Sequence, residues 1–358
     1  QAHYKMEIRK IKKSEWEKLR AFNEAEYKPG HILTNKIYYD WQFDGPFNLN
    51  KESYESLGLF DSSETLVGTF GLFASPFNFF GQTVSGVSLC NLIVKKSLRS
   101  LGYGYLLMEK AAALADLALD HTINETAWPI FMKAGWKGEN LKRYLYVINP
   151  KNALYDLPAS SHKINTEKNW HFDEVTEFSK ETDIFWHKIQ NRYPIAIERN
   201  AVYLNWRYAR NPLIKYRMLA VKSGEEIKAL AILRIEEPKT ESGPLGIKVG
   251  RLIDFISDEE AELFAIGGVV DFCRASGLDF IDYFSSGPFH RDSLSAAGFI
   301  DGERVGYNEV PLLFNPVSAK RRYLNFAVKI GKSLDNSRTW DLYNWYTTKG
   351  GGDQDRAY

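Results

Sequence analysis

The chain has 358 residues, with 46 lysines and arginines against 45 aspartates and glutamates, which leaves a formal net charge of +1. This balance argues against a nucleic-acid partner or an acidic membrane surface, because both require a concentrated positive field. The length corresponds to about two domains, since single cores stop growing near about 250 to 300 residues. Cys90 and Cys273 lie far apart within apolar segments, so we expect a reducing, cytoplasmic location rather than a disulfide framework. We also expect no membrane span, because no apolar run reaches about 18 to 20 residues.

The N-terminal part of the sequence predicts alternating strands and helices. Residues 6–12 alternate as a strand does, and a helix follows to about Glu26. A turn-rich segment at 27–31 leads into an aromatic run at 37–43. Residues 65–74 and 79–89 predict two strands joined by a hairpin at Ser75-Pro76-Phe77-Asn78.

Residues 85–113 predict a buried strand, a glycine-containing turn and a long amphipathic helix. The turn, Arg99-Ser100-Leu101-Gly102-Tyr103-Gly104, runs directly into the helix. A helix start offers several unpaired backbone N–H groups and about half a positive charge, so a pyrophosphate could approach the bare amides. The simpler alternative is a glycine turn that only lets a strand enter a helix.

A second pattern lies downstream, at Asn124-x-x-Ala127-x-x-x-Phe131-x-x-x-Gly135-Trp136. Its spacing places Asn124, Ala127 and Phe131 on one helical face, and Gly135 is a natural helix stop. Together with Leu92-x-Val94-x-x-x-x-Arg99-x-x-Gly102-x-Gly104-x-x-Leu107, this pattern resembles the two consecutive acyl-CoA motifs of the GNAT superfamily of N-acyltransferases. An ordinary helix packed on a sheet is the alternative for the second pattern alone.

The resemblance implies an α+β fold of two tandem GNAT-like domains, each with a mixed, mostly antiparallel sheet flanked by helices. It also implies acetyl-CoA or another acyl-CoA as co-substrate, and no metal. The residues implied in binding it are Leu92, Ile93, Val94, Arg99, Ser100, Leu101, Gly102, Tyr103, Gly104, Tyr105, Asn124, Ala127 and Phe131. Many relatives carry tyrosine in place of Phe131 and use it to protonate the leaving thiolate, which phenylalanine cannot do.

Catalysis of acyl transfer to an amine needs a general base with a pKa near neutral, which histidine satisfies without tuning. A strand predicted at 117–122 ends in Asp120 and His121, and we expect His121 to be the base, with His31 as second choice. A lone histidine at a strand end is nevertheless more often structural. The resemblance makes Tyr27 and Trp41 candidate substrate-binding residues, with packing roles as the alternative.

The second half of the sequence looks like a worn copy of the first. Residues 250–254 align with 90–94, and 294–299 align with 131–136. Where the first copy has its glycine turn, the second has four acids in Ser257–Glu262, so we expect no CoA there. Residues 144–148 are expected to close the first domain as its final strand.

We therefore expect an N-terminal GNAT domain at 1–150, a linker at 151–170, a degenerate second domain at 171–330 and a C-terminal tail at 331–358. Residues 204–212 resemble a segment of tandem-GNAT proteins of bacterial surface-sugar biosynthesis. Trp206 and Arg207 in that segment could hold an acceptor or lock the two domains together.

These features predict an N-acyltransferase that moves an acyl group from acetyl-CoA to a primary amine of a small molecule, with an amino sugar as the favoured guess. One alternative is a tandem-GNAT aminoacyl or peptidyl transferase that uses aminoacyl-tRNA, although the near-zero charge argues against RNA. The other is a non-catalytic acyl-CoA-binding module, which Phe131 keeps open. The sequence does not indicate the oligomeric state.

Overall fold

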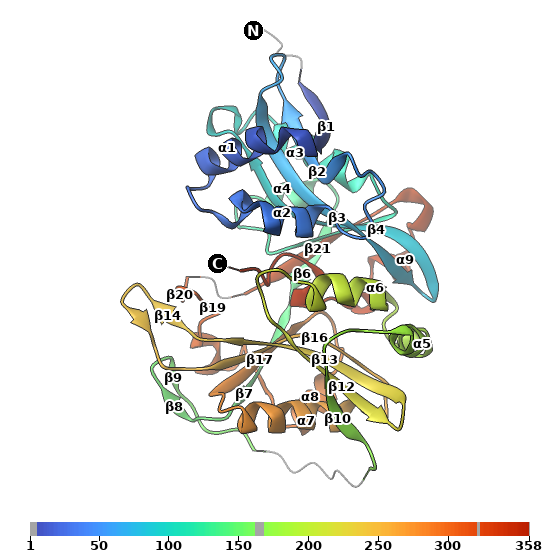
Figure 1. The fold of residues 1–358 in the computed structure, drawn as a ribbon, viewed down its shortest axis with the longest axis vertical. Helices are drawn as coiled ribbons and strands as arrows, with labels where there is room; N and C mark the ends of the chain where they lie inside the picture. The colour runs from blue at the N-terminus through green and yellow to red at the C-terminus, as the bar shows by residue number, and fades with distance from the viewer. Residues whose placement is uncertain (1–5, 162–167, 321–322, 358) are drawn as a thin grey trace.

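The structure is a computed structural model that describes residues 6–161, 168–320 and 323–357. The chain forms two large mixed sheets, one in each half of the molecule, with helices packed on both (Figure 1). This arrangement confirms the expected mixed α+β class. Residues 162–167 of the expected linker, 321–322 of the expected second domain and 358 of the expected tail lie outside the described ranges.

The first sheet has the strand order β1-β2-β3-β4-β5-β21-β6, and β11 pairs with β3. Its strands are β1 (Glu7–Lys12), β2 (Ser53–Phe60), β3 (Leu66–Phe79), β4 (Gln82–Val94), β5 (Leu117–His121), β6 (Lys137–Asn140), β11 (Ile195–Ile197) and β21 (Asn325–Ile330). The helices that pack on it are α1 (Trp16–Glu26), α2 (Lys36–Phe43), α3 (Tyr103–Ala112) and α4 (Trp128–Lys133). β4 and β5 are parallel, and the other pairs are antiparallel.

The second sheet has the order β10-β12-β13-β16-β17-β7-β18. Its strands are β7 (Lys142–Val147), β10 (His171–Val175), β12 (Arg217–Ser223), β13 (Glu226–Glu236), β16 (Val249–Ser257), β17 (Phe280–Ser285) and β18 (Ile300–Asp301). The helices of this half are α5 (Lys180–Ile189), α6 (Ala201–Leu204), α7 (Glu262–Ala275) and α8 (Arg291–Ala296). Here β16 and β17 form the parallel pair.

Shorter elements connect these parts. Three two-stranded hairpins are β8 (Lys151–Asn152) with β9 (Tyr155–Asp156), β14 (Lys239–Thr240) with β15 (Gly243–Pro244), and β19 (Leu313–Phe314) with β20 (Val317–Ser318). Single helical turns are η1 (Lys13–Glu15), η2 (Ile32–Thr34), η3 (Lys96–Leu98), η4 (Gln190–Arg192), η5 (Asn205–Ala209), η6 (Tyr307–Glu309), η7 (Lys332–Leu334), α9 (Ser337–Trp340), η8 (Leu342–Asn344) and η9 (Lys349–Gly351).

The hairpin between β3 and β4 lies later than the sequence analysis placed it. The chain turns at Phe80 and Gly81, whose φ angles are 50° and 89°. Two consecutive positive φ angles are typical of the tight turn that matches strand twist, and glycine adopts one of them without strain. Asn78 lies inside β3, and its side chain accepts a hydrogen bond from the Gly81 N–H at 2.9 Å. The expected turn at 75–78 is therefore wrong.

The two halves repeat one plan and exchange one strand. The run β4-α3-β5-α4-β6 corresponds to β16-α7-β17-α8-β18, and each run contains the parallel pair. However, β7 lies between β17 and β18 in the second sheet, whereas β21 lies between β5 and β6 in the first. The expectation that residues 144–148 close the first domain is therefore wrong. Each sheet is completed by a strand from the other half.

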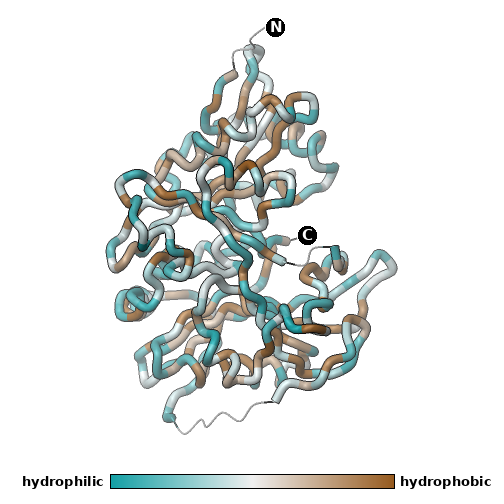
Figure 2. Tube along the Cα trace, turned by 180° about the vertical axis from the view of Figure 1, so that it is seen from behind, coloured by the Kyte–Doolittle hydropathy of each residue, from teal (hydrophilic) through white to brown (hydrophobic). Residues whose placement is uncertain are grey.

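The segment after β21 is packed rather than free, contrary to the tail expected at 331–358. Trp345 and Tyr346 are each 1% exposed, and Thr348 is fully buried. Trp345 and Tyr346 join a core that also contains Phe77 of β3 and Trp186 of α5, so this core spans both halves. Hydrophobic and hydrophilic stretches alternate along the chain in both halves (Figure 2). Within the described residues, no helix combines the length and apolarity needed to cross a membrane.

Because β21 completes the first sheet, we predict that residues 1–150 do not fold alone. The fragment would lose the strand that bears Phe326 and Val328, both fully buried, and would leave β5 and β6 with unpaired edges. Circular dichroism and size-exclusion chromatography test this. Co-expression with residues 151–358 supplies β21 and should recover a co-purifying complex. A soluble 1–150 fragment with a sharp thermal transition of its own would contradict the prediction.

Candidate functional site

A pocket of about 450 Å³ opens where β4 and β5 separate. Their parallel pairing ends at Leu89 and Asp120. Beyond this point Asn91 has a φ of 57°, and the register between β3 and β4 shifts, as in a β-bulge. The bulge turns the end of β4 away from β5, so the backbone between Asn91 and Val94 has no β5 partner. The pocket is lined by Tyr27, Asn91, Leu92, Asp120, His121, Thr122, Ile123, Asn124, Ala127, Phe131, Leu312, Leu313, Leu324, Lys349, Asp353, Gln354 and Arg356.

The glycine turn lies next to this pocket and presents bare amides. Leu106 N–H donates to the Gly102 carbonyl at 3.1 Å, and the four preceding amides, Gly102 to Tyr105, have no acceptor in the part of the chain that the structure describes. Gly102 has a φ of 85°. A Cβ on Gly102 would meet nothing within 4 Å, and one on Gly104 would meet only Leu92 at 4.0 Å. The space above the amides is open, and Leu92 connects it to the pocket.

Arg99 is fixed at the mouth of the turn. Its Nε donates to the Val94 carbonyl at 2.8 Å, and its guanidinium forms an ion pair with Glu26 at 3.1 Å. The side chain is 50% exposed, so part of the guanidinium remains accessible. A cation beside unpaired amides at the start of α3 favours an anionic ligand.

The expected residues before and on α4 form another side of the pocket. The Asn124 side chain accepts a hydrogen bond from Ala127 N–H at 2.8 Å, which shapes the turn before the helix. Phe131 packs edge-on against Trp136, with ring centroids 4.9 Å apart. Asn91 Nδ2 and Thr122 Oγ1 are buried without hydrogen-bond partners in the described structure, and both residues line the pocket. Buried polar atoms are normally paired, so these two are available to a ligand.

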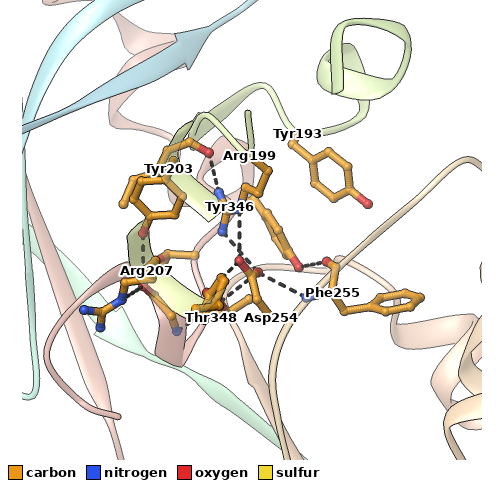
Figure 3. A network of polar contacts seen from close by, with 12 residues as sticks. Tyr193, Arg199, Tyr203, Arg207, Asp254, Phe255, Tyr346 and Thr348 are labelled. Carbon is orange, nitrogen blue, oxygen red and sulfur yellow. Dashed lines mark hydrogen bonds and ion pairs between the residues drawn. The ribbon is translucent and has the colours of Figure 1, made fainter. Parts of the chain in front are cut away.

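The C-terminal segment forms the opposite side of the pocket through Lys349, Asp353, Gln354 and Arg356. Arg207 holds this segment in place, because its Nε donates to the Gly350 carbonyl at 3.2 Å and its Nη2 donates to the Gly352 carbonyl. Tyr203 donates to the same Gly350 carbonyl at 3.1 Å. Figure 3 shows Tyr203 and Arg207 near Asp254. Asp254 accepts hydrogen bonds from Arg199, Tyr208 and Thr348.

The same segment fills the corresponding split of the second half. Parallel pairing of β16 and β17 ends at Leu252 and Tyr283, and Thr348 then forms an antiparallel bridge with Ser285. Tyr346 donates to the Phe255 carbonyl beside it (Figure 3). The second half thus has two features that disfavour CoA, the acids predicted from sequence and a split occupied by the chain itself.

Two carboxyl groups, Asp120 and Asp353, line the pocket and are 5% and 8% exposed. Burial and the nearby Asp353 raise the pKa of Asp120 well above its ordinary value. Asp353 forms an ion pair with Arg356 at 3.4 Å, and Arg356 also donates to Asn91 Oδ1 at 3.1 Å. The pocket therefore contains one carboxyl group with an unusually high proton affinity.

The two expected histidines occupy different environments. His121 lines the pocket but is 3% exposed, and its Nε2 lies 2.8 Å from Thr347 Oγ1. Burial and the charges of Arg207 and Arg199 lower its pKa to about 3. His31 stacks on Tyr27 with ring centroids 4.3 Å apart, and burial lowers its pKa to about 4. Both rings are thus neutral at pH 7 and poor proton acceptors.

The candidate substrate residues separate into two groups. Tyr27 lines the pocket, and its hydroxyl lies 3.4 Å from the Asn91 carbonyl. Trp41 and Trp206 are paired across the two halves, since each indole N–H donates to the other's carbonyl at 2.8 Å. Neither they nor Arg207 line the pocket, so their contacts match the structural alternative of a lock between the halves.

Four residues that line the pocket, Asp120, Lys349, Asp353 and Arg356, were not predicted from the sequence as site residues. Asp120 could have been singled out, because it ends the strand expected to diverge from β4. The signal for the others was the run Gly350 to Gly352, which indicates a close backbone approach as well as a flexible tail. A Cβ on Gly352 would lie 2.5 Å from His121 Nδ1, so glycine is required at that contact.

If Arg207 holds the C-terminal segment in place, replacing this side chain, which is 1% exposed, should lower the stability of the protein substantially. We expect Arg207→Met to lower the free energy of unfolding by about 2–4 kcal/mol, because the Gly350 and Gly352 carbonyls lose buried charge-assisted hydrogen bonds. Arg210→Met is the matched control, since Arg210 lies close by in sequence, is 68% exposed and should change stability by less than about 0.5 kcal/mol. Urea unfolding curves measure the stability of both variants. Equal unfolding midpoints for Arg207→Met and Arg210→Met would contradict the role of Arg207 in holding the C-terminal segment.

No protein-family model matches the sequence, and no curated protein matches it. Solved structures do share the fold. A GCN5-related N-acetyltransferase from Anabaena variabilis ATCC 29413 has a TM-score of 0.57 at 10% identity, with 91% of this chain and 73% of that chain covered. A probable N-acyltransferase from Enterococcus faecalis V583 has a TM-score of 0.57 at 12% identity, covering 91% and 72%.

N-myristoyltransferase from Saccharomyces cerevisiae, solved with bound myristoyl-CoA, has a TM-score of 0.52 at 12% identity, covering 90% of this chain and 82% of that chain. These identities are too low to transfer an activity, but each similarity extends over both halves of the chain. The chain therefore has the GNAT fold.

Proposed function

We propose that this protein is an acyl-CoA-dependent N-acyltransferase that transfers an acyl group, acetyl in the simplest case, to the primary amine of a small molecule. The observation that supports this most is that the open β4/β5 split and a carboxyl group of raised pKa lie in the same pocket. The glycine turn with its bare amides adjoins this pocket. An amino sugar is the acceptor class that the sequence resemblance favours.

On the donor side, the amides of Gly102 to Tyr105 and the Arg99 guanidinium would bind the CoA pyrophosphate. The backbone from Leu92 to Val94, which pairs with β3 but has no β5 partner, would hold the pantetheine arm and polarise the thioester carbonyl, which stabilises negative charge as the amine attacks. Ala127 and Phe131 would pack beside the thioester.

On the acceptor side, we propose Asp120 rather than His121 as the general base. An attacking amine must lose a proton, and a carboxylate of raised pKa accepts that proton more readily at neutral pH. Phe131 has no proton for the departing thiolate. The Asp120 carboxyl group, protonated by the amine, can deliver that proton to the sulfur, so that the step ends with free CoA and an amide.

Phe131 also favours one second candidate, a module that binds acyl-CoA without turning it over. Amine-dependent release of CoA thiol excludes that function. An aminoacyl or peptidyl transferase is disfavoured by the net charge of +1.

Gly104→Glu should abolish acetyl-CoA binding. The residue lies in α3 with ordinary φ and open space around it, so the side chain fits, but its carboxylate would repel the pyrophosphate. Gly104→Ala is the matched control and should stay folded and bind, since alanine adds one methyl group and favours the helix. Calorimetry with acetyl-CoA measures binding, and circular dichroism checks the fold. Binding by a folded Gly104→Glu equal to wild type would place the cofactor elsewhere.

Asp120→Asn should reduce kcat by about 10²- to 10⁴-fold while acetyl-CoA affinity changes little. The base must be deprotonated to act, so wild-type kcat/KM should fall as pH is lowered through the raised pKa of Asp120. The variant should lose that acidic limb, whereas His121→Gln should retain it. A thiol-release assay from pH 5 to pH 9 measures the profiles. An acidic limb that survives in Asp120→Asn and vanishes in His121→Gln would instead identify His121 as the base.

A further inference from the structure

A chain of buried ion pairs runs behind the pocket. It alternates in sign, and its contacts are Arg143–Asp282 at 3.0 Å, Asp282–Arg251 at 2.6 Å, Arg251–Glu236 at 2.9 Å, Glu236–Arg234 at 3.7 Å and Arg234–Asp355 at 2.7 Å. No side chain in it is more than 11% exposed. The described members of this chain are three guanidinium groups and three carboxylates, whose charges cancel.

Lys349 adds a seventh charge next to this neutral chain. The residue is 4% exposed. The charges of Asp282, Asp355 and Glu236 act to raise the pKa of Lys349, but each of those carboxylates is already paired with an arginine. Burial and Arg251 lower the pKa of Lys349 to about 8, which still leaves it mostly protonated at pH 7. Among the described residues, Lys349 forms no ion pair. Counted over the described residues, the cluster therefore holds one excess positive charge at a buried position, which is costly without a counterion.

Lys349 is also one of the residues that line the pocket. Lys349 lines it beside Leu312, and the Leu312 carbonyl accepts a hydrogen bond from Arg251 at 3.2 Å, so this wall of the pocket joins the ion-pair chain. The remainder of this wall is apolar, with Leu313 and Leu324. An anionic group in the pocket would meet two cationic side chains, Lys349 and Arg356, of which Arg356 is already paired with Asp353. Asp120 and Asp353 bring two carboxyl groups to the same pocket.

We propose that Lys349 is an anion-binding subsite for the acceptor, and that the acceptor carries a carboxylate or a phosphate in addition to its amine. This inference rests on the proposed function. The carboxyl groups of Asp120 and Asp353 would attract the amine, while Lys349 would hold the anionic group. Two opposite charges fixed at two points orient the acceptor for attack.

Thermal stability separates this role from a structural one. Lys349→Met keeps a long apolar side chain and removes the excess charge, so its Tm without ligand should rise by about 2 °C or more. Arg251→Met is the matched control within the same cluster, and its Tm should fall because Asp282 and Glu236 lose their partner. A Tm of Lys349→Met that falls like that of Arg251→Met would show that Lys349 compensates the carboxylates, and would overturn the proposal.

Anion binding is tested with inorganic phosphate and acetate, titrated by calorimetry in the presence of saturating CoA so that the glycine turn is occupied. Wild type should bind at least one of the two, and Lys349→Met should bind about tenfold more weakly or not at all. Lys349→Arg should stay within about threefold of wild type because it keeps the charge. Equal binding by wild type and Lys349→Met, or no binding by wild type, would overturn the subsite.

Pairs of acceptors that differ only in an anionic group test whether the subsite affects turnover. One pair tests a carboxylate and the other tests a phosphate. Glycine is compared with glycinamide, and glucosamine 6-phosphate with glucosamine, by CoA thiol release. The anionic member of at least one pair should be preferred about tenfold or more in kcat/KM, and Lys349→Met should remove that preference. Turnover without preference leaves the function standing and overturns the subsite. Phosphate binding that depends on Lys349 without release of thiol from any amine supports the subsite and counts against the function.

Discussion

Each half of the molecule supplies the strand that completes the sheet of the other half, and the site depends on this reciprocal exchange. β21, from the second half, pairs along β5, with Ala327 opposite Asp120 and Phe326 opposite His121. One edge of β5 is therefore held by β21, a strand from a distant part of the sequence. The other edge pairs with β4 only as far as Asp120, and the pocket opens where that pairing ends. After β21 the chain returns between the two sheets, which brings Lys349 and Asp353 to that pocket.

The two copies of the fold use the same split in different ways. In the first half the split between β4 and β5 stays open and is adjoined by a turn with bare amides and a cation. In the second half Tyr346 and Thr348 occupy the split between β16 and β17, held by Asp254 and by the Phe255 carbonyl. The second copy thereby anchors the segment that carries charged side chains into the pocket of the first. Loss of the glycine turn in the second copy is consistent with this change of use, because a filled split needs no anion site.

Local sequence signals predicted the parts of the structure that depend on local interactions. The strand, glycine turn and helix at 85–113 follow from periodicity and from unpaired amides, and the correspondence of the two halves was visible in short aligned segments. The exchange of β7 and β21 could not be predicted, because a strand with alternating apolar residues pairs equally well with either sheet. Residue type alone favoured His121 over Asp120 as the base, because the ordinary pKa of histidine is near neutral. Burial and partners far away in the sequence, Asp353 for one and Arg207 for the other, shift their pKa values in the directions that favour Asp120. The glycine run at 350–352 resembled a flexible end, although its glycines are required by close packing, Gly350 against Tyr208, Gly351 against Thr347 and Gly352 against His121.

Hydrogen–deuterium exchange with and without acetyl-CoA tests the central claim most directly, because it reports on both copies of the fold in one experiment. We predict slower amide exchange on binding at residues 91–105 and 120–133, which contain the open split, the turn and α4. We predict no change at residues 253–262, where the corresponding split is filled. Protection in the second half instead of the first, or none in either, would contradict the assignment of the acyl-CoA site to the β4/β5 split.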